Sequence, residues 1–182
     1  MSLNTPTVSP KITAEQALRR LLTLISASLS VENFTPERLE QVMGVPIKHW
    51  EGGYGYGFEE DITPQWIFRF MVSEDTALGK KERHPRFELN FIPSVLGASP
   101  PMTDICQFDY DHFTAELEAM GFDREPYYDA LAPGPRQPLM YDSFYNPDKR
   151  MLIEVYPKGE GVRTQDQGSK PGRGCVKMII IK

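Results

Sequence analysis

The sequence predicts an α+β fold with a mainly antiparallel sheet and about three helices on one face. Two segments that resemble helices end in the same dipeptide, Met43-Gly44 and Met120-Gly121, and strand-like sequence follows each of them. The strand-like segments are joined by links of hairpin length, which favours antiparallel over parallel pairing. The chain is therefore expected to contain a duplicated unit of one helix and three strands, over residues 35–93 and 111–182.

The first helix is predicted to run from Thr13 to about Ser28. Thr13-Ala14-Glu15-Gln16 fits a capping box, in which the Thr hydroxyl and the Gln side chain satisfy amides at the start of the helix. Apolar residues then recur at helical spacing and form a single stripe. They are Leu18, Leu21, Leu22, Ile25 and Leu29.

Two further helices are predicted from their ends. One begins with Thr35 as N-cap and Pro36 as its first residue, and it ends at Gly44, which can adopt a left-handed cap conformation. The other is expected to run from Asp111, as N-cap, to Met120. Both are short and lead into strand-like sequence.

Strands are predicted where β-prone residues alternate or cluster. The candidates are residues 47–58, 66–72, 86–91, 139–145, 151–156 and 175–182. Residues 86–91 alternate strictly between polar and apolar, so one face of that strand should be buried. Residues 178–181 are the most β-prone run and are expected in a buried, central strand. Residues 73–85 and 126–138 are expected to be loops.

Composition limits both the size of the fold and the class of partner. The chain has 182 residues, 40% of them hydrophobic and 25% charged, which suits one domain with its own core. We expect that domain over residues 13–182, after a disordered tail over residues 1–12. The net charge of −5 argues against nucleic acid as a partner, and no apolar run approaches the length of a membrane helix.

Cys106 and Cys175 are the two cysteines of the chain. A chain of this size needs no disulfide to stabilise its core, and two cysteines make a poor disulfide framework. The first residues lack the apolar segment of a signal peptide. We therefore expect both thiols to be reduced and packed inside a cytoplasmic protein.

The segment from Trp50 to Asp61 interleaves aromatic residues and glycines with acids. Its carboxylates would repel a phosphate backbone, and it lacks the spacing of a P-loop or dinucleotide site. The glycines can mark a strand against which another element packs closely. Alternatively, exposed aromatic side chains form binding hot spots and neighbouring acids attract a basic partner. The predicted partner-binding residues are Trp50, Glu51, Tyr54, Tyr56, Glu59, Glu60 and Asp61.

A second cluster contains Cys106, His112 and nearby acids. A nucleophilic Cys needs a base within hydrogen-bond reach, but no known nucleophile motif surrounds Cys106. Asp104, Asp109 and Asp111 could offer oxygen ligands, yet they fit no calcium-loop spacing, and capping a helix is a sufficient role for Asp111. We predict no catalytic residue, no metal and no cofactor.

In general character the chain resembles the immunity proteins of bacterial polymorphic-toxin, contact-dependent and type VI secretion systems. The likeness lies in a small acidic α+β chain with an aromatic and acidic segment, the helix end Leu117-Glu118-Ala119-Met120-Gly121-Phe122 and the closing strand 175–181. It implies a non-enzymatic inhibitor that binds and neutralises a cognate toxin, with a basic toxin domain as partner. Two alternatives stay open: a secretion chaperone-like protein that binds a client segment, and an enzyme with an unrecognised site.

Overall fold

A computed structural model describes residues 11–51, 55–75, 84–132, 137–158 and 174–182. The described residues form three α-helices: α1 (Ala14–Ser26), α2 (Pro36–Met43) and α3 (Tyr110–Ala119). Their strands are β1 (Lys48–His49), β2 (Gly55–Thr63), β3 (Trp66–Asp75), β4 (His84–Pro93), β5 (Asp123–Tyr128), β6 (Leu139–Asn146), β7 (Met151–Lys158) and β8 (Cys175–Ile181). Short 3₁₀ helices lie at Val31–Asn33 and Thr103–Ile105.

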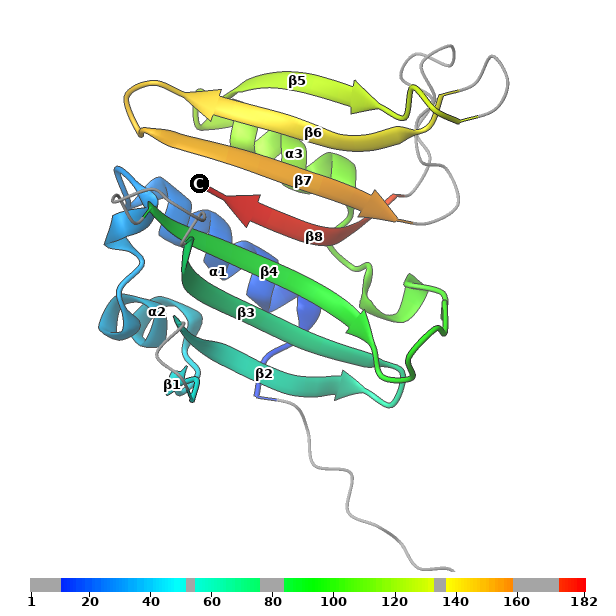
Figure 1. Ribbon diagram of the computed structural model, residues 1–182, viewed down its shortest axis with the longest axis horizontal. Coiled ribbons are helices and arrows are strands. Elements are labelled where there is room, and N and C mark those ends of the chain that lie inside the picture. The colour runs from blue at the N-terminus through cyan, green and yellow to red at the C-terminus, as the bar shows by residue number, and fades with distance from the viewer. Residues whose placement is uncertain (1–10, 52–54, 76–83, 133–136, 159–173) are drawn as a thin grey trace, which may run out of the picture.

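All eight of these strands belong to one antiparallel sheet, in the order β1-β2-β3-β4-β8-β7-β6-β5 (Figure 1). Two meanders, one from β1 to β4 and one from β5 to β8, meet where β4 pairs with β8. The pairing runs from Phe87 opposite Ile181 to Asn90 opposite Met178. This arrangement confirms the predicted α+β class and antiparallel sheet. It also places β8 in the interior of the sheet, as its apolar sequence predicts.

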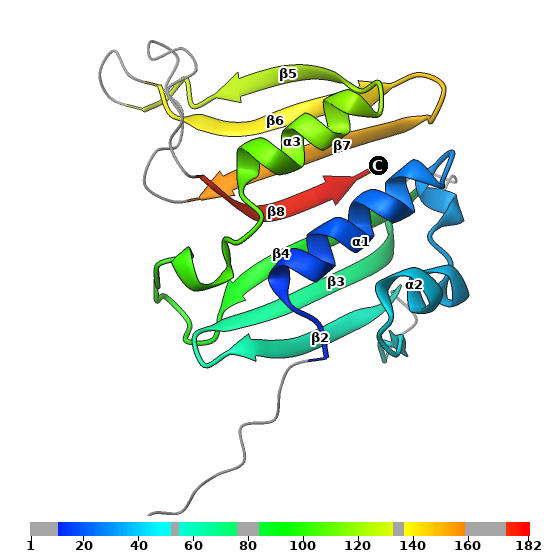
Figure 2. The same cartoon turned by 180° about the vertical axis from the view of Figure 1, so that it is seen from behind.

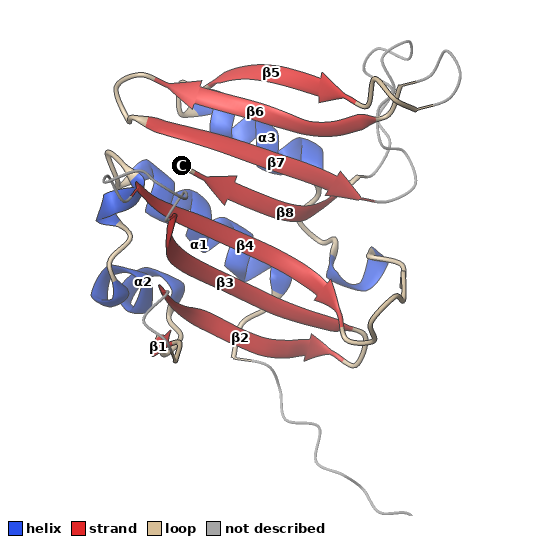
Figure 3. Cartoon of the chain, in the orientation of Figure 1, coloured by secondary structure: helices blue, strands red, loops and turns tan. Residues whose placement is uncertain are grey.

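The helices lie on one side of the sheet (Figures 2 and 3). α1 and α3 run side by side across that face, and α2 packs beside α1 near β1 and β2. The core between the helices and the first meander is rich in phenylalanine. These rings occupy alternate positions of β2, β3 and β4, so they all point to the helix side of the sheet. The buried rings are Phe58, Phe68, Phe70, Phe87 and Phe91. Leu18, Leu21 and Ile25 of α1 are buried with them.

The caps of α1 and α2 are as predicted. Thr13 accepts a hydrogen bond from the Gln16 amide at 3.2 Å, and the Gln16 side chain accepts one from the Thr13 amide at 3.0 Å. Thr35 accepts from the amide of Arg38 at 3.3 Å. Gly44 closes α2 with φ of 66°, a conformation that costs glycine little. These local signals place the starts of both helices and the end of α2, but α1 ends at Ser26 rather than Ser28, and Leu29 is exposed outside its apolar stripe.

The predicted N-cap of α3 is wrong by two residues. Asp109, not Asp111, caps the helix, and its carboxylate accepts a hydrogen bond from the amide of His112 at 2.9 Å. Both acids suit an N-cap, so the sequence leaves two choices. A contact with a residue far along the chain favours Asp109 as the cap, because the amide of Tyr110 donates a hydrogen bond to the carbonyl of Gly174 at 2.8 Å. The helix therefore starts at Tyr110.

The predicted loop over residues 126–138 is also partly wrong, because residues up to Tyr128 belong to β5. Pro126 lies inside this strand, opposite Asp142. Proline is tolerated there because, among the described strands, β5 lies at the edge of the sheet and pairs with β6 only. The predicted hairpin loop over residues 73–85 is shorter as well, because β3 extends to Asp75 and β4 begins at His84. Residues 76–83 of that loop lie outside the described residues.

Of the predicted disordered tail over residues 1–12, the structure describes Lys11 and Ile12. Residues 1–10 lie outside the described part of the chain. Ile12 is fully buried, and the amide of Lys11 donates to Oε2 of Glu60 at 2.8 Å. The folded part of the chain therefore includes these two residues. The strands of the predicted repeats at 35–93 and 111–182 form the two halves of the single sheet.

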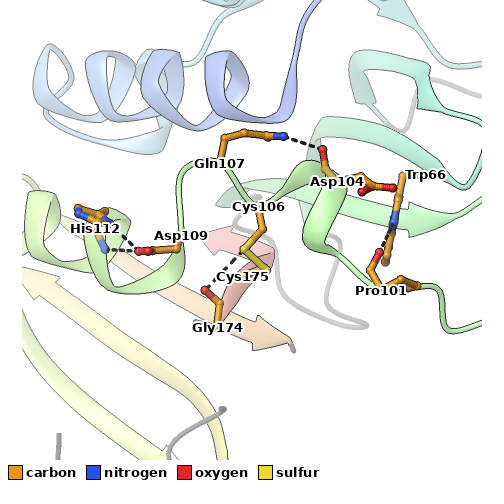
Figure 4. Close-up of a disulfide and its surroundings, with 9 residues drawn as sticks. All are labelled: Trp66, Pro101, Asp104, Cys106, Gln107, Asp109, His112, Gly174 and Cys175. Atoms are coloured by element: carbon orange, nitrogen blue, oxygen red, sulfur yellow. Dashed lines mark hydrogen bonds and ion pairs between the residues drawn. A yellow bond between two sulfur atoms is a disulfide. The ribbon is translucent and has the colours of Figure 1, made fainter. Parts of the chain in front are cut away.

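The prediction that both cysteines are reduced is wrong. Cys106 and Cys175 form a disulfide, with Cα atoms 5.4 Å apart and 69 residues of sequence separation (Figure 4). The bond joins the link before α3 to the first residue of β8. The sequence does not reveal this pairing, because the two cysteines are brought together by β8 entering the middle of the sheet. Such bonds persist in oxidising compartments and are rare in the cytosol.

Candidate protein-binding face

The described helices cover one face of the sheet and leave the other face uncovered. In β3, Trp66, Phe68 and Phe70 are buried beneath the helices, while Ile67 and Arg69 point to the opposite side and are half-buried. No helix of the described chain covers that opposite side, which faces the viewer in Figure 1. We call it the open face. It consists of the outward side chains of β2 to β8.

Strand pairing aligns the residues of the open face in rows. One row runs from β5 to β2 and contains Tyr127, Tyr141, Tyr156, Met178, Asn90, Arg69 and Glu59. The next row contains Glu125, Ser143, Glu154, Ile180, Glu88 and Met71. A row of tyrosines on β5, β6 and β7 thus lies next to carboxylates on β5 and β7. In the centre of the face, Met178 and the buried Ile180 lie directly beside the polar residues Asn90, Glu88 and Glu154.

The tyrosines of the first row form a continuous stack. The ring centroids of Tyr127 and Tyr141 are 4.8 Å apart with an interplanar angle of 10°, and those of Tyr141 and Tyr156 are 5.0 Å apart. Such ring pairs hold one another in place, because each fixes the position of the next. The open face therefore presents the tyrosines in a defined arrangement.

Two of these tyrosines donate hydrogen bonds to carboxylates. The Tyr127 hydroxyl donates to Glu125 and the Tyr156 hydroxyl donates to Glu154, each at 3.1 Å. Burial and the Glu154 charge raise the pKa of Tyr156 to about 12, and the bond to Glu125 raises the pKa of Tyr127. Both hydroxyls therefore stay protonated at neutral pH and act as donors to the two carboxylates.

A hollow of about 440 Å³ lies among these side chains, over β5, β6 and β7. Its lining includes Glu125, Tyr127, Tyr141, Ser143, Tyr145 and Glu154. Tyr145 is 52% exposed and Tyr127 is 40% exposed, so both rings are accessible. Large aromatic groups that are exposed and held in place by neighbours are typical of surfaces that bind another molecule.

Arg124 also lines the hollow, but its charge is held on the helix side of the sheet. Its guanidinium forms an ion pair with the buried carboxylate of Asp142 and lies 3.6 Å from Glu118. On the open side, Lys182 donates to Glu154 at 2.8 Å. Among the described residues, no cation forms an ion pair with Asp123 or Glu125 on the outer side of β5. The hollow is therefore acidic.

The predicted binding residues are divided between the two faces. Glu59 and Asp61 are exposed on the open face, and Glu59 lies 3.7 Å from Arg69. A Cβ built on Gly57, which faces the same way, would lie 2.7 Å from the Trp50 ring, so Trp50 covers this end of the open face. Glu51 is exposed beside it.

The other predicted binding residues lie elsewhere. The Tyr56 hydroxyl donates to the carbonyl of Phe34 at 2.9 Å, and Glu60 accepts a hydrogen bond from Lys11. Both residues therefore point to the helix side, as alternation along β2 requires. Tyr54 lies outside the described residues.

The tyrosines of β5, β6 and β7 are the residues that the sequence prediction missed. Residues 139–146 do alternate, with Tyr141, Ser143 and Tyr145 on one face and Asp142 and Phe144 on the other. That period could have indicated a row of outward tyrosines within one strand. The stack across three strands depends on register, which a single sequence does not reveal.

The cluster around Cys106 does not form a catalytic site in this structure (Figure 4). Cys106 is bonded to Cys175, so it has no thiolate to act as a nucleophile. The His112 ring is 74% exposed and contacts Asp109 at 2.8 Å, while Asp104 lies on the opposite side of the disulfide. Within the described ranges, no group of three or more His, Cys, Asp or Glu residues is placed to hold a metal ion.

Comparison with known proteins gives no match to any family model, curated protein or solved structure. Searched over its described residues, the chain has no helix that is both long and apolar enough to cross a bilayer. The class of the protein is thus given by the fold of its described residues, an eight-stranded antiparallel sheet with helices on one side.

Proposed function

We propose that this protein is a non-enzymatic protein-binding module, and that its open face binds a basic partner protein. One observation carries the proposal. A stack of tyrosines hydrogen-bonded to carboxylates, Tyr127 to Glu125 and Tyr156 to Glu154, lies on the side of the sheet that no described helix covers.

The chemistry of the face fits protein recognition. Tyrosines contribute large contact areas with few rotatable bonds, which makes them frequent hot spots. The carboxylates beside them attract a positively charged surface and raise the rate of association. Met178, within the tyrosine row, and Leu152, opposite Tyr145, are both half-buried and supply apolar contact beside these polar groups. The residues Trp50, Glu59 and Asp61 extend the same face at its other end.

The finer proposal is an immunity-type inhibitor that neutralises a cognate toxin by covering a basic surface of the toxin. It follows from the resemblance in general character together with the acidic net charge of −5. On this proposal the protein needs no cofactor, nucleic acid or membrane. A cytoplasmic location stays a prediction, and the Cys106–Cys175 bond weighs against it, since cytosolic thiols are kept reduced.

The test is a binding measurement with matched charge reversals on the two sides of the sheet. Proteins captured from the native host by the full chain are identified, purified and titrated by calorimetry. Glu125→Lys on the open face should weaken binding at least tenfold, because it reverses a charge at the contact. Glu116→Lys makes the same change on the exposed side of α3 and should leave affinity within about twofold.

The outcomes separate the proposals. Equal effects of Glu125→Lys and Glu116→Lys would place the binding site away from the open face. Rescue of cells from a toxin encoded beside the gene would support the inhibitor, and Trp50→Ala then tests the far end of the face. A dimer that binds an extended client peptide would favour the chaperone alternative instead.

A further inference from the structure

The hollow over β5, β6 and β7 is built around one small residue. Ser143 lies on the open face of β6 between Tyr141 and Tyr145, which are two residues before and after it. Its partners across the sheet are Glu125 of β5 and Glu154 of β7. Ser143 is therefore the floor, with an aromatic ring at each end along the strand and a carboxylate on each side.

The dimensions of this frame suit a flat cation. Neighbouring strands lie about 5 Å apart, so the strands that carry the two carboxylates are separated by about 10 Å. A planar group placed over Ser143 can therefore donate hydrogen bonds to both sides. The hollow measures about 440 Å³, which accommodates the end of a long side chain.

The charge of the frame favours a cation with several donors. Oε2 of Glu125 and Oε2 of Glu154 already accept from tyrosine hydroxyls, and Oε1 of Glu154 accepts from Lys182 at 2.8 Å. These bonds fix the carboxylates in place while each retains further acceptor capacity. Asp123 adds a third carboxylate at the edge, on the same lining.

We infer that this hollow receives an arginine side chain of the partner protein, with its guanidinium over Ser143. The inference rests on the proposed function, since it names the group of the basic partner that the open face recognises. A guanidinium is planar, carries five donors and stacks on tyrosine rings, whereas an ammonium is a compact and strongly hydrated charge. Arginine therefore uses both the carboxylates and the exposed ring of Tyr145, since the Tyr141 ring already packs against Tyr127 and Tyr156.

The probe is the peptide acetyl-Gly-Arg-Gly-amide, titrated into the ¹⁵N-labelled full chain with its disulfide intact. Chemical-shift changes should centre on Ser143 and its neighbours in β5 and β7. The same peptide with citrulline, in which a neutral urea replaces the guanidinium, should bind at least fivefold more weakly. Changes spread evenly over the protein, or equal binding of the two peptides, would overturn the inference.

Two variants separate shape from charge. Glu125→Gln keeps the shape and should weaken the arginine peptide about threefold, while Glu116→Gln on α3 should not change it. Ser143→Phe fills the floor, leaves both carboxylates in place and should abolish binding. The amide spectrum of each variant reports whether it is folded. Unchanged binding by Ser143→Phe with a native spectrum would also overturn the inference.

This experiment can fail independently of the proposed function. If the partner protein binds and Glu125→Lys weakens it, but the arginine peptide causes no changes at Ser143, the open face stands and the arginine site is wrong. If the peptide binds at Ser143 and no protein partner shows dependence on the open face, the proposed function is wrong and the guanidinium site stands.

Discussion

The hydroxyl of Tyr110 lies 2.8 Å from Oδ2 of Asp142 and joins α3 to the buried side of β6. Asp142 is fully buried, and its carboxylate also forms an ion pair with Arg124 of β5. Burial, strengthened by the Asp142 charge, raises the pKa of Tyr110 far above its ordinary value, so the phenol stays a hydrogen-bond donor. These three residues hold the strands that carry the tyrosine stack against the helix layer.

Arg124→Met is expected to lower the free energy of unfolding by about 3 kcal/mol, because it leaves the Asp142 carboxylate buried without its cation. Urea denaturation followed by tryptophan fluorescence measures the change. Glu118→Gln is the matched control. Glu118 lies 3.6 Å from the same guanidinium but is about half exposed, so its loss should cost less than about 1 kcal/mol.

The double variant Arg124→Met with Asp142→Leu should recover most of that loss, since removal of both charges removes the desolvation penalty as well. The Tyr110 hydroxyl keeps an acceptor there, because it also lies 2.9 Å from the carbonyl of Val155. If the double variant is less stable than Arg124→Met alone, the carboxylate stabilises the fold in some way other than this ion pair.

The disulfide gives a second prediction. Reduction, or replacement of both Cys106 and Cys175 by serine, should lower the free energy of unfolding by about 2–4 kcal/mol, because the bond closes a long loop in the unfolded chain. Thermal unfolding with and without a reductant measures it. Reductant should not change the melting temperature of the double serine variant. If both proteins respond equally to reductant, the effect does not come from this bond.

Sequence reasoning succeeds here where a structural choice depends on neighbours along the chain. Thr13 and Gln16 form their capping box within one helical turn, and Gly44 ends α2 in the conformation that its lack of a side chain permits. The alternation in residues 86–91 predicts which side chains of β4 are buried, and Phe87 and Leu89 are indeed fully buried.

Sequence reasoning fails where distant residues decide. Asp109 and Asp111 are equivalent as caps until Tyr110 is held by Gly174, a residue that precedes β8. The pairing of Cys106 with Cys175 likewise depends on where β8 enters the sheet. The candidate site has the same origin, because Tyr127, Tyr141 and Tyr156 come from three strands whose register no local pattern specifies.

Lys177 provides a prediction about pH. It sits at an irregularity of β8, where the register changes between Tyr156 opposite Met178 and Pro157 opposite Val176. Its ammonium donates to the carbonyl of Phe91 and is half-buried. Burial, with repulsion from a neighbouring lysine, lowers its pKa from 10.5 to about 8.

Between about pH 8 and 10.5, the unfolded chain binds a proton at Lys177 that the folded chain has lost, so this residue makes stability rise with pH over that window. Below pH 8 the cost of the buried charge is fully present. The free energy of unfolding of Lys177→Met, minus that of the parent, should therefore be more favourable at pH 7 than at pH 10.5. The expected difference is about 1–2 kcal/mol, because the ammonium group is partly solvated. Urea denaturation at both pH values measures the difference.

Lys158 is the neighbouring lysine, and both ammonium groups lie over the Trp66 ring, at 5.4 and 5.5 Å from its centroid. Lys158→Met removes the repulsion and should raise the pKa of Lys177, so the pH dependence should become smaller. A difference between Lys177→Met and the parent that is the same at pH 7 and 10.5 would contradict the prediction.

Gly57 lies on β2 opposite Met71 of β3 and close to the Trp50 ring. A Cβ at this position would collide with the backbone carbonyl of Phe70 and would lie 2.7 Å from the Trp50 ring. Gly57→Ala should therefore lower the free energy of unfolding by about 2 kcal/mol, measured by urea denaturation. Gly174→Ala is the control, because its Cβ would make an ordinary contact at 3.5 Å from Tyr110.

Truncating Trp50 to Ala in the Gly57→Ala background should restore little stability, because the strand carbonyl is the main obstacle. Full recovery would instead show that the glycine is needed for the Trp50 ring alone.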